Sequence, residues 1–377
     1  MCGILGHFTV ENNFSADRFA RANNIVKYRG PDDFGYITLN NEYKINTWTD
    51  ENMNDYNSQS RTIGGLGFRR LSIIDLSING HQPMQVSDGL VWIIYNGEVY
   101  NYIELKNELI EKGYNFSTLT DTEVILYSYI EWGKDCLKKF NGMFSFAILD
   151  LREKIIFCAR DRFGVKPFYY YFNNKNFIFA SEIKQILELL PRKTDANYTV
   201  LFDFLSTGSY GNETEETYFN KVFRLIPGYY YLVDISNPNE INLKKIKWWD
   251  FNPDEIKVNY SEQVVFDNIR LLLEDSIKLR LRSDVTLGTC LSGGLDSSGL
   301  VCITDKLLSI YNHKHKVFVI GSNNPEYDET SYAKIIINKT NTDAYFKTPS
   351  SEDLQNDLNK FIWHHDEPLI KASMFGG

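Results

Sequence analysis

The chain lacks an excess of positive charge, long apolar runs and a secretory leader. Its 377 residues include 40 Lys and Arg against 49 Asp and Glu, which gives a formal net charge of −9. Nucleic-acid-binding proteins usually gather Lys and Arg on one face, so this balance favours small-molecule chemistry. No stretch approaches the roughly 20 apolar residues that a membrane-spanning helix needs, and the N-terminus has no basic segment followed by an apolar one. We therefore expect a cytoplasmic protein.

Cysteine is also scarce, and its spacing argues against two common uses. The five cysteines lie far apart and form no C-x-x-C pair: Cys2, Cys136, Cys158, Cys290 and Cys302. An odd number at these spacings fits neither a disulfide framework nor a zinc site. The paired histidines, His313 with His315 and His364 with His365, are better explained by surface positions or structural hydrogen bonds than by a metal site. We expect reduced thiols and no metal held by these side chains.

The length of the chain predicts two domains, because 377 residues exceed what one hydrophobic core usually organises. Up to about Leu190, short β-rich runs alternate with turn signals, as at 91–95 before Asn96-Gly97. Helical spacing interrupts them near 102–112 and 121–132. A later segment, 212–250, holds Pro227-Gly228 between β-rich stretches. That segment predicts a hairpin leading out of an α+β domain.

From Ser261 onward the pattern changes to helices that alternate with short apolar strands. The expected order is a helix at 264–282, a strand at 285–291, a helix at 297–311 and a strand at 317–320. Such alternation is typical of an α/β layer with a parallel sheet. We therefore place the first domain at 1–212, a connecting hairpin or linker at 213–257 and the second domain at 258–377.

Cys2 could have unusual reactivity because it follows the initiator Met. Removal of Met1 would leave a thiol and a free α-amine on one residue. An α-amine has a pKa of about 7.7–8.0 and can accept the thiol proton near neutral pH. Taken alone, a cysteine at this position is more often an ordinary residue, so the pattern gains weight only from other segments.

Five further segments occur in a characteristic order along the first domain. They are Arg29-Gly30-Pro31-Asp32-Asp33, Arg70-Leu71-Ser72-Ile73-Ile74-Asp75, Tyr95-Asn96-Gly97-Glu98-Val99-Tyr100-Asn101, Thr120-Asp121-Thr122-Glu123 and Ala159-Arg160-Asp161-Arg162-Phe163-Gly164. Together with Cys2 they resemble the class II glutamine amidotransferases, and their spacing is similar to that of the glutamine-hydrolysing asparagine synthetases. The resemblance covers the whole first domain. It implies an N-terminal-nucleophile (Ntn) hydrolase fold, an αββα sandwich.

The resemblance assigns the reacting groups to three residues. Cys2 would attack the glutamine carboxamide, forming a γ-glutamyl thioester and releasing ammonia. Asn96 and the backbone N–H of Gly97 would form the oxyanion hole, where each donor contributes roughly 3–4 kcal/mol. The alternative for Asn96-Gly97 is a hairpin turn, for which this dipeptide is the strongest short-range signal.

Three charged residues would bind the glutamine head group. Arg70 would bind the α-carboxylate through its guanidinium fork, while Glu98 and Asp121 would hold the ammonium end. The alternative for each is a surface salt bridge, worth about 0–1 kcal/mol, or for Asp121 the acidic first turn of a helix. For the 160–164 segment we favour a structural ion-pair turn.

The second domain carries a glycine-rich loop between the expected strand 285–291 and the following helix. Its sequence is Ser292-Gly293-Gly294-Leu295-Asp296-Ser297-Ser298, without the Gly-Lys-Ser/Thr of a Walker loop. Backbone N–H groups and a helix N-terminus would bind an anion there. The loop resembles the pyrophosphate-binding loop of the ATP-pyrophosphatase family, which implies an adenine-nucleotide alpha-hydrolase-like (PP-loop) domain. The implied ATP-binding residues are Leu291, Ser292, Gly293, Gly294, Asp296 and Ser297. The alternative is a glycine turn with Asp296 or Ser297 capping the helix.

The resemblance extends to 326–331 and 365–368, although helix capping and a terminating proline explain both segments equally well. The family's later Ser-Gly-x-Gly-x-Asp-Glu loop has no counterpart in the chain. We therefore expect a partial PP-loop domain in a fragment or truncated product, with apolar surface left exposed. In that case amide synthesis is impaired while glutamine hydrolysis survives.

The implied overall reaction is glutamine-dependent asparagine synthesis. Ammonia from glutamine would reach a β-aspartyl-AMP intermediate, giving asparagine, glutamate, AMP and pyrophosphate. ATP, Mg²⁺ and aspartate are implied by the resemblance, and a homodimer is compatible with it. Two alternatives stay open. The acceptor is another carboxylate, such as a sugar in surface-polysaccharide synthesis, or the chain retains only glutaminase or partner-binding activity.

Overall fold

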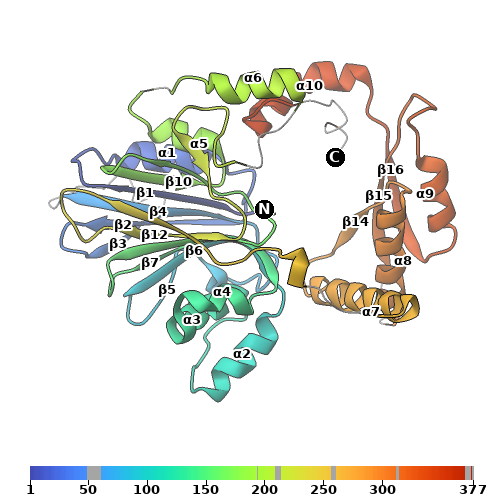
Figure 1. The fold of residues 1–377 in the computed structure, drawn as a ribbon, viewed down its shortest axis with the longest axis horizontal. Coiled ribbons are helices and arrows are strands. Elements are labelled where there is room, and N and C mark those ends of the chain that lie inside the picture. Colours follow the sequence, from blue (N-terminus) through green and yellow to red (C-terminus); the bar gives the residue numbers. More distant parts are fainter. Residues whose placement is uncertain are drawn as a thin grey trace. The chain divides into compact units, whose positions relative to one another are not determined.

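The computed structural model describes residues 1–48, 61–192, 194–208, 214–255, 260–310, 314–369 and 375. The chain divides into two compact units, Met1–Asn252 and Pro253–Gly377 (Figure 1). The predicted boundaries at 212/213 and 257/258, like His313, lie outside the described residues, and these boundaries stay predictions.

The first unit contains two antiparallel sheets. The seven-stranded sheet has the order β11-β9-β10-β1-β4-β2-β3, and the six-stranded sheet has the order β13-β12-β8-β7-β6-β5. The strands of the first sheet are β1 (Gly3–Thr9), β2 (Asp33–Asn40), β3 (Ile45–Trp48), β4 (Thr62–Arg70), β9 (Tyr169–Phe172), β10 (Asn176–Ala180) and β11 (Val222–Arg224). Those of the second are β5 (Met84–Val86), β6 (Val91–Val99), β7 (Gly142–Asp150), β8 (Ile155–Arg160), β12 (Tyr229–Asp234) and β13 (Asn242–Lys247).

Helices cover the outer face of each sheet. The helices are α1 (Ala16–Ile25), α2 (Tyr102–Glu111), α3 (Asp121–Trp132), α4 (Cys136–Lys139), α5 (Ile183–Leu189) and α6 (Tyr198–Thr207). In Figure 1, α1 and α5 lie over the seven-stranded sheet, and α2, α3 and α4 lie below the six-stranded one. The expected αββα sandwich is confirmed, and the predicted helix at 121–132 has the bounds of α3.

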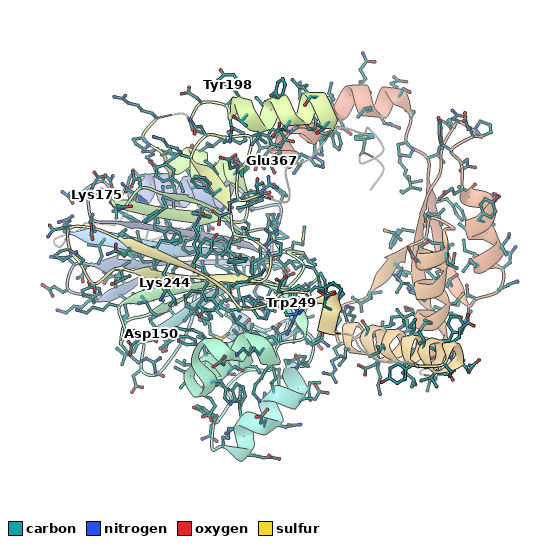
Figure 2. The ribbon with its side chains drawn as sticks, in the orientation of Figure 1. Asp150, Lys175, Tyr198, Lys244, Trp249 and Glu367 are labelled. Carbon is teal, nitrogen blue, oxygen red and sulfur yellow. The ribbon has the colours of Figure 1, made fainter. Side chains whose placement is uncertain are left out.

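Side-chain alternation along each strand builds the core of this sandwich. Ile4 and Phe8 of β1 face the core between the sheets, whereas Leu5 packs against the residues of α1 and α5. A third cluster buries apolar side chains between β6 and α3. Figure 2 shows the side chains on these ribbons. Asp150, at the end of β7, is fully buried and accepts hydrogen bonds of 2.9 and 2.6 Å from Arg152.

The segment around Pro227-Gly228 differs from its prediction. The dipeptide joins β11 to β12, which belong to different sheets, and the hairpin lies instead between β12 and β13. β12 also pairs with β8. The segment is therefore part of the first unit's sheets rather than a linker, because Tyr231 and Val233 of β12 are buried in the core between the sheets.

The second unit confirms the expected α/β pattern. Its described strands form a parallel sheet in the order β14-β15-β16. The elements are α7 (Glu262–Arg280), β14 (Gly288–Cys290), α8 (Leu295–Ser309), β15 (His315–Ile320), α9 (Thr330–Ile337), β16 (Thr342–Lys347) and α10 (Ser351–His365). The core is small, and large apolar side chains such as Leu272 and Leu295 are 70% and 90% exposed. Within the described part of the chain, no helix is long and apolar enough to cross a membrane.

Candidate active site

Cys2 directly precedes β1 and is half-buried. The backbone N–H of Leu71 donates to its Sγ at 3.3 Å, and Sγ lies 3.6 Å from the Leu71 carbonyl oxygen. Burial raises the pKa of the thiol above its ordinary value, while the hydrogen bond from Leu71 acts in the opposite direction. The thiol therefore needs a base to react as a thiolate near neutral pH.

The structure brings most of the predicted glutamine-binding residues into one pocket. Cys2, Arg70, Gly97, Glu98 and Asp121 all line a pocket of about 340 Å³. They come from the start of β1, the end of β4, the end of β6 and the start of α3. Residues 119 positions apart in the sequence thus meet because both sheets end at this pocket.

Asn96 and Gly97 do not form a turn. Both lie inside β6, paired with Ser145 and Phe144 of β7, so the hairpin-turn alternative is wrong. A Cβ on Gly97 would lie 2.3 Å from the carbonyl oxygen of Met143, so only glycine allows this close strand pairing.

The side chain of Asn96 is 1% exposed, and its Nδ2 has no hydrogen-bond partner. A buried donor without a partner costs free energy, typically about 1–3 kcal/mol. Such a group is expected where a ligand supplies the acceptor. The alternation of β6 puts Asn96 on the same face as Glu98, which lines the pocket.

The carboxyl groups of Glu98 and Asp121 both line this pocket and influence each other's charge. Asp121 Oδ2 accepts hydrogen bonds from the Tyr95 hydroxyl at 2.7 Å and the Val99 N–H at 2.9 Å. Burial raises the pKa of Asp121 to about 6. Burial and the neighbouring Asp121 raise the pKa of Glu98 to about 9, against the opposing effect of Lys166. The pair therefore retains a proton at neutral pH.

Arg70 is held inside the fold rather than in a surface salt bridge. Its side chain is 5% exposed, and its guanidinium donates to the carbonyl oxygens of Ser77 at 2.8 Å, Ile74 at 3.3 Å and Asp75. A Cβ on Gly80 would lie 1.8 Å from Arg70 Nη2, so glycine makes room for the guanidinium. These bonds fix the charge at the wall of the pocket.

The 160–164 segment is structural, as expected, but its charges bind backbone groups. Asp161 accepts hydrogen bonds from the backbone N–H groups of Phe144, Phe163, Val165 and Lys166. Arg160 donates to the carbonyl oxygens of Gly164, Lys166 and Leu225, each at 2.7 Å. The turn also places Lys166, whose pKa is lowered by burial, where its charge acts on Glu98 and Cys2. Sequence reasoning did not single out Lys166, and only its place two residues after Gly164 could have suggested it.

The glycine-rich segment of the second unit follows β14, but its last four residues, 295–298, belong to the first turn of α8, two residues earlier than the helix start predicted at 297. α8 begins at Leu295, and its N-cap residue Gly294 makes no side-chain capping bond, so Asp296 and Ser297 lie inside the helix and do not cap it as the alternative required. Ser297 Oγ instead contacts Ser292 Oγ at 3.0 Å across the loop. Gly293 has a φ of +90°, and a Cβ there would lie 2.7 Å from Tyr332 Cβ.

Two other segments have local structural roles. Asp328 accepts hydrogen bonds from Ser322 N–H at 3.2 Å and from the Thr330 hydroxyl at 2.7 Å, at the start of α9. Asp366 follows the end of α10 with a φ of +61°. Both observations fit helix-end geometry.

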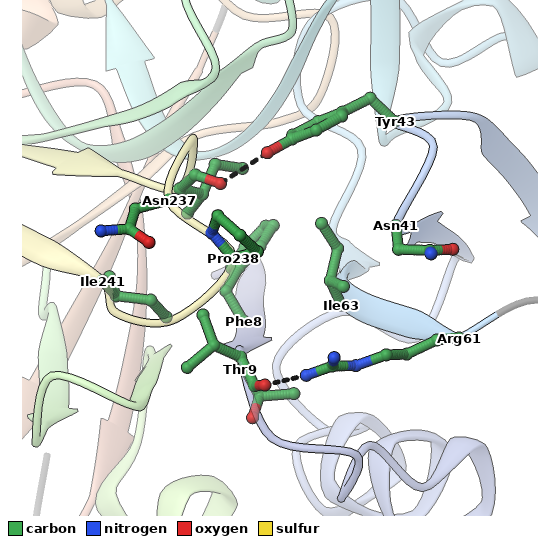
Figure 3. A pocket seen from close by; sticks show the side chains of 11 residues that line it. Phe8, Thr9, Asn41, Tyr43, Arg61, Ile63, Asn237, Pro238 and Ile241 are labelled. Carbon is green, nitrogen blue, oxygen red and sulfur yellow. Dashed lines mark hydrogen bonds between the residues drawn. The ribbon is translucent and has the colours of Figure 1, made fainter.

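A larger pocket lies at the other end of β1. It measures about 590 Å³, and Phe8, Tyr43 and Arg61 contribute to its wall (Figure 3). Tyr43 there donates a 2.7 Å hydrogen bond to the Ile235 carbonyl oxygen. None of the predicted site residues lines this larger pocket. A choice of active site by pocket volume alone would therefore have missed Cys2.

Comparison of the sequence with known proteins shows the family to which the chain belongs. A family described as "Glutamine amidotransferase domain" matches residues 52–249, and one described as "Asparagine synthase" matches residues 268–376. A putative asparagine synthetase [glutamine-hydrolyzing] 2 from Methanocaldococcus jannaschii is 35% identical over all of this chain and 70% of its own length. The chain belongs to the glutamine-hydrolysing asparagine synthetase family.

Other relatives in the family are longer than this chain. Asparagine synthetase [glutamine-hydrolyzing] 1 of Bacillus subtilis is 33% identical over 98% of this chain but only 53% of its own length. A putative asparagine synthetase [glutamine-hydrolyzing] of Mycobacterium bovis is 30% identical over 99% of this chain and 56% of its own length. The chain thus spans about half the length of these two relatives.

Proposed function

We propose that the first unit hydrolyses glutamine to glutamate and ammonia, with Cys2 as the nucleophile. One observation carries the proposal. Cys2 shares a pocket with the buried carboxyl group of Asp121, the half-buried one of Glu98 and the buried guanidinium of Arg70, and the neighbouring Asn96 has an unpartnered amide donor. These are the groups that a neutral carboxamide with an amino-acid head group requires.

The proposed reaction begins after removal of Met1. The α-amine of Cys2 accepts the thiol proton, and Sγ adds to the carboxamide carbon. Asn96 Nδ2 and the Gly97 N–H donate to the oxyanion that forms. The ammonium of Cys2 returns the proton to the departing nitrogen, which leaves as ammonia. Water then hydrolyses the thioester to glutamate and regenerates the thiol.

The head group of glutamine explains the unusual carboxyl pair. An ammonium beside Glu98 and Asp121 would lower the pKa of both groups and let the retained proton leave. Arg70 carries a positive charge, so its guanidinium would bind the negatively charged α-carboxylate of glutamine. A zwitterionic substrate therefore supplies the cation that these carboxyl groups lack.

For the whole chain, we propose participation in glutamine-dependent asparagine synthesis. Family membership and the start of α8, which has no side-chain cap and lies within the segment from Ser292 to Ser297, support ATP as the second substrate. Aspartate as the acceptor, Mg²⁺, a homodimer and a cytoplasmic location stay predictions. The loop would hold the phosphates of ATP through backbone N–H groups, and ATP would supply the activation of the acceptor carboxylate.

The test is glutamate release from glutamine by purified protein whose N-terminus has been shown by mass spectrometry to begin at Cys2. Hydrolysis should be lost in Cys2→Ala and kept in Cys302→Ala, because Cys302 is exposed on α8. Equal activity of Cys2→Ala and the unaltered protein would overturn the proposal.

A further inference from the structure

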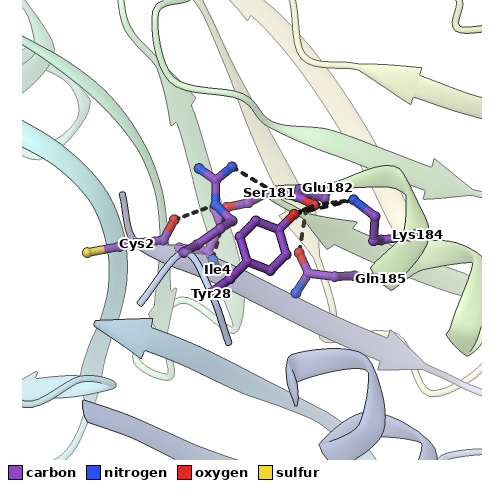
Figure 4. A network of polar contacts seen from close by, with 8 residues as sticks. Cys2, Ile4, Tyr28, Ser181, Glu182, Lys184 and Gln185 are labelled. Carbon is purple, nitrogen blue, oxygen red and sulfur yellow. Dashed lines mark hydrogen bonds and ion pairs between the residues drawn. The ribbon is translucent and has the colours of Figure 1, made fainter. Parts of the chain in front are cut away.

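The main chain of the nucleophile is held by a buried polar network outside the glutamine pocket. Arg29 Nε donates to the Cys2 carbonyl oxygen at 2.9 Å, and Arg29 Nη1 forms an ion pair with Glu182 Oε1 at 3.0 Å. Figure 4 shows the network that joins Cys2 to Glu182; Arg29 lies in the loop after α1 and Glu182 at the turn before α5. Arg29 and Glu182, 153 positions apart in the sequence, thereby hold the carbonyl group of Cys2 in place.

Glu182 is itself fixed from several sides. Its carboxylate accepts hydrogen bonds from the Tyr28 hydroxyl and Lys184 Nζ, and its backbone N–H donates to Gln185 Oε1 at 3.2 Å. The side chains of Arg29 and Glu182 are only 8% and 9% exposed. Burying such a pair often adds no stability, since desolvation offsets the attraction. A role in fixing geometry is therefore the better explanation for it.

Ser181 holds the chain two residues after the nucleophile. The Ile4 N–H donates to Ser181 Oγ at 3.0 Å, and the Ser181 N–H donates to the Ile4 carbonyl oxygen at 3.0 Å. The regular pairing of β1 with β10 begins at Leu5 and Ala180. Ser181 thus extends that pairing by one residue with its side chain, and its own side chain is fully buried.

We propose that Ser181 and Glu182 are positioning residues for glutamine hydrolysis. Through Ile4 and Arg29 they fix the backbone on both sides of Gly3, and so place Cys2 Sγ against Asn96 and Gly97. The inference rests on the proposed function, because the position of Cys2 matters to the reaction only if Cys2 is the nucleophile. Neither residue is among the described residues that line the glutamine pocket.

Ser181, Glu182 and Arg29 together form a clamp on the backbone next to Cys2, and the proposed reaction explains why such a clamp is needed. Once Met1 is removed, Cys2 is a chain terminus with one covalent connection, and termini are poorly ordered unless other groups hold them. A reacting atom displaced by about 1 Å can cost roughly 100-fold in rate. The clamp would supply order that the sequence around Cys2 cannot.

The test compares Glu182→Gln and Ser181→Ala with Glu188→Gln in the full chain. Glu188 lies on the same helix, α5, but pairs with Arg21 at the surface. Both clamp variants should lower kcat for glutamine hydrolysis about 10- to 100-fold while KM changes less than about 3-fold. Backbone amide exchange of residues 3–8 should become at least about 10-fold faster. Glu188→Gln should match the unaltered protein in all three quantities.

The two readouts separate this inference from the function on which it rests. Unchanged kcat and unchanged exchange in both folded clamp variants would overturn the clamp. A rise in KM that equals the fall in kcat/KM would also overturn it, since it would indicate a substrate contact. If Glu182→Gln fails to fold, Ser181→Ala alone decides. If the unaltered protein does not hydrolyse glutamine, the proposed function fails, and with it the catalytic role of the clamp; faster exchange would then show only a structural one.

Discussion

At the scale of single residues, the site combines buried polar groups that are incompletely satisfied. Asn96 Nδ2 and Glu98 Oε2 are buried atoms without a hydrogen-bond partner. Other buried polar atoms of the described residues also lack a partner, such as Ser128 Oγ and Gln185 Nε2, so it is the position of Asn96 and Glu98 beside the pocket of Cys2 that connects these two with a ligand. In the proposed complex, the carboxamide oxygen of glutamine would accept a hydrogen bond from Asn96 Nδ2, and its ammonium would donate one to Glu98 Oε2.

Removal of the Asn96 donor should affect the transition state more than the substrate complex. We expect Asn96→Ala to lower kcat for glutamine hydrolysis about 100- to 1,000-fold, with a smaller change in KM, because the oxyanion forms only during the reaction. Steady-state glutamate release measures both constants. A variant with unaltered kcat would show that Asn96 is not an oxyanion donor.

Glu98 should make stability depend on pH. Its pKa is raised from 4.5 to about 9 in the folded chain, so the folded state prefers the protonated form. This contribution to stability is fully present below pH 4.5 and is lost progressively as pH rises toward 9. Glu98→Gln, which resembles the protonated form, should therefore gain Tm relative to the unaltered protein between pH 5 and pH 8. A constant difference in Tm across this range would contradict the shift.

At the scale of elements, the tight pairing of β6 with β7 sets the position of Asn96 and Gly97, the proposed oxyanion donors. Gly97 lies opposite Phe144, and a Cβ at position 97 would collide with the backbone of β7. The dipeptide Asn96-Gly97 is locally a turn signal. The nonlocal strand pairing overrides that preference, which is why local pattern reading ended the strand too early.

A methyl group at position 97 should separate these strands. We expect Gly97→Ala to lower the free energy of unfolding by about 1–3 kcal/mol and to abolish measurable glutamine hydrolysis. Urea denaturation measures the first quantity. Gly299→Ala is the control, since a Cβ there meets nothing within 4 Å on α8, and it should be neutral or stabilising by up to about 1 kcal/mol. Equal stability of both variants would argue against the collision.

At the scale of the whole molecule, sequence motifs predicted the αββα sandwich, the parallel α/β unit and most of the residues that meet in the pocket beside Cys2. Helix α3 was predicted well because its cap Thr120 and its apolar spacing are local signals. The crossover at Pro227-Gly228 and the contacts of Glu182 with Arg29 were not predicted. These depend on pairings between distant segments, which leave no periodic pattern in one sequence.

A substitution in the second unit should change ATP binding without changing glutamine hydrolysis by the first unit. We expect Ser297→Ala, in the first turn of α8, to weaken ATP binding about 10-fold while glutamine hydrolysis stays within about 2-fold, because all the proposed glutaminase residues belong to the first unit. Equilibrium binding of ATP and glutamate release give the two numbers. Loss of glutamine hydrolysis in this variant would show that the first unit does not act alone.

The most direct test of the central claim is covalent labelling of Cys2. A glutamine analogue that carries a chloromethyl ketone in place of the carboxamide should alkylate one thiol with loss of chloride, and peptide mass spectrometry should place the label on Cys2. Glutamine should slow the labelling, and Asp121→Asn should slow it further, because the analogue keeps the amino-acid head group. Labelling of Cys290 or Cys302 at the same rate, or labelling of Cys2 that glutamine does not slow, would contradict a glutamine site at Cys2.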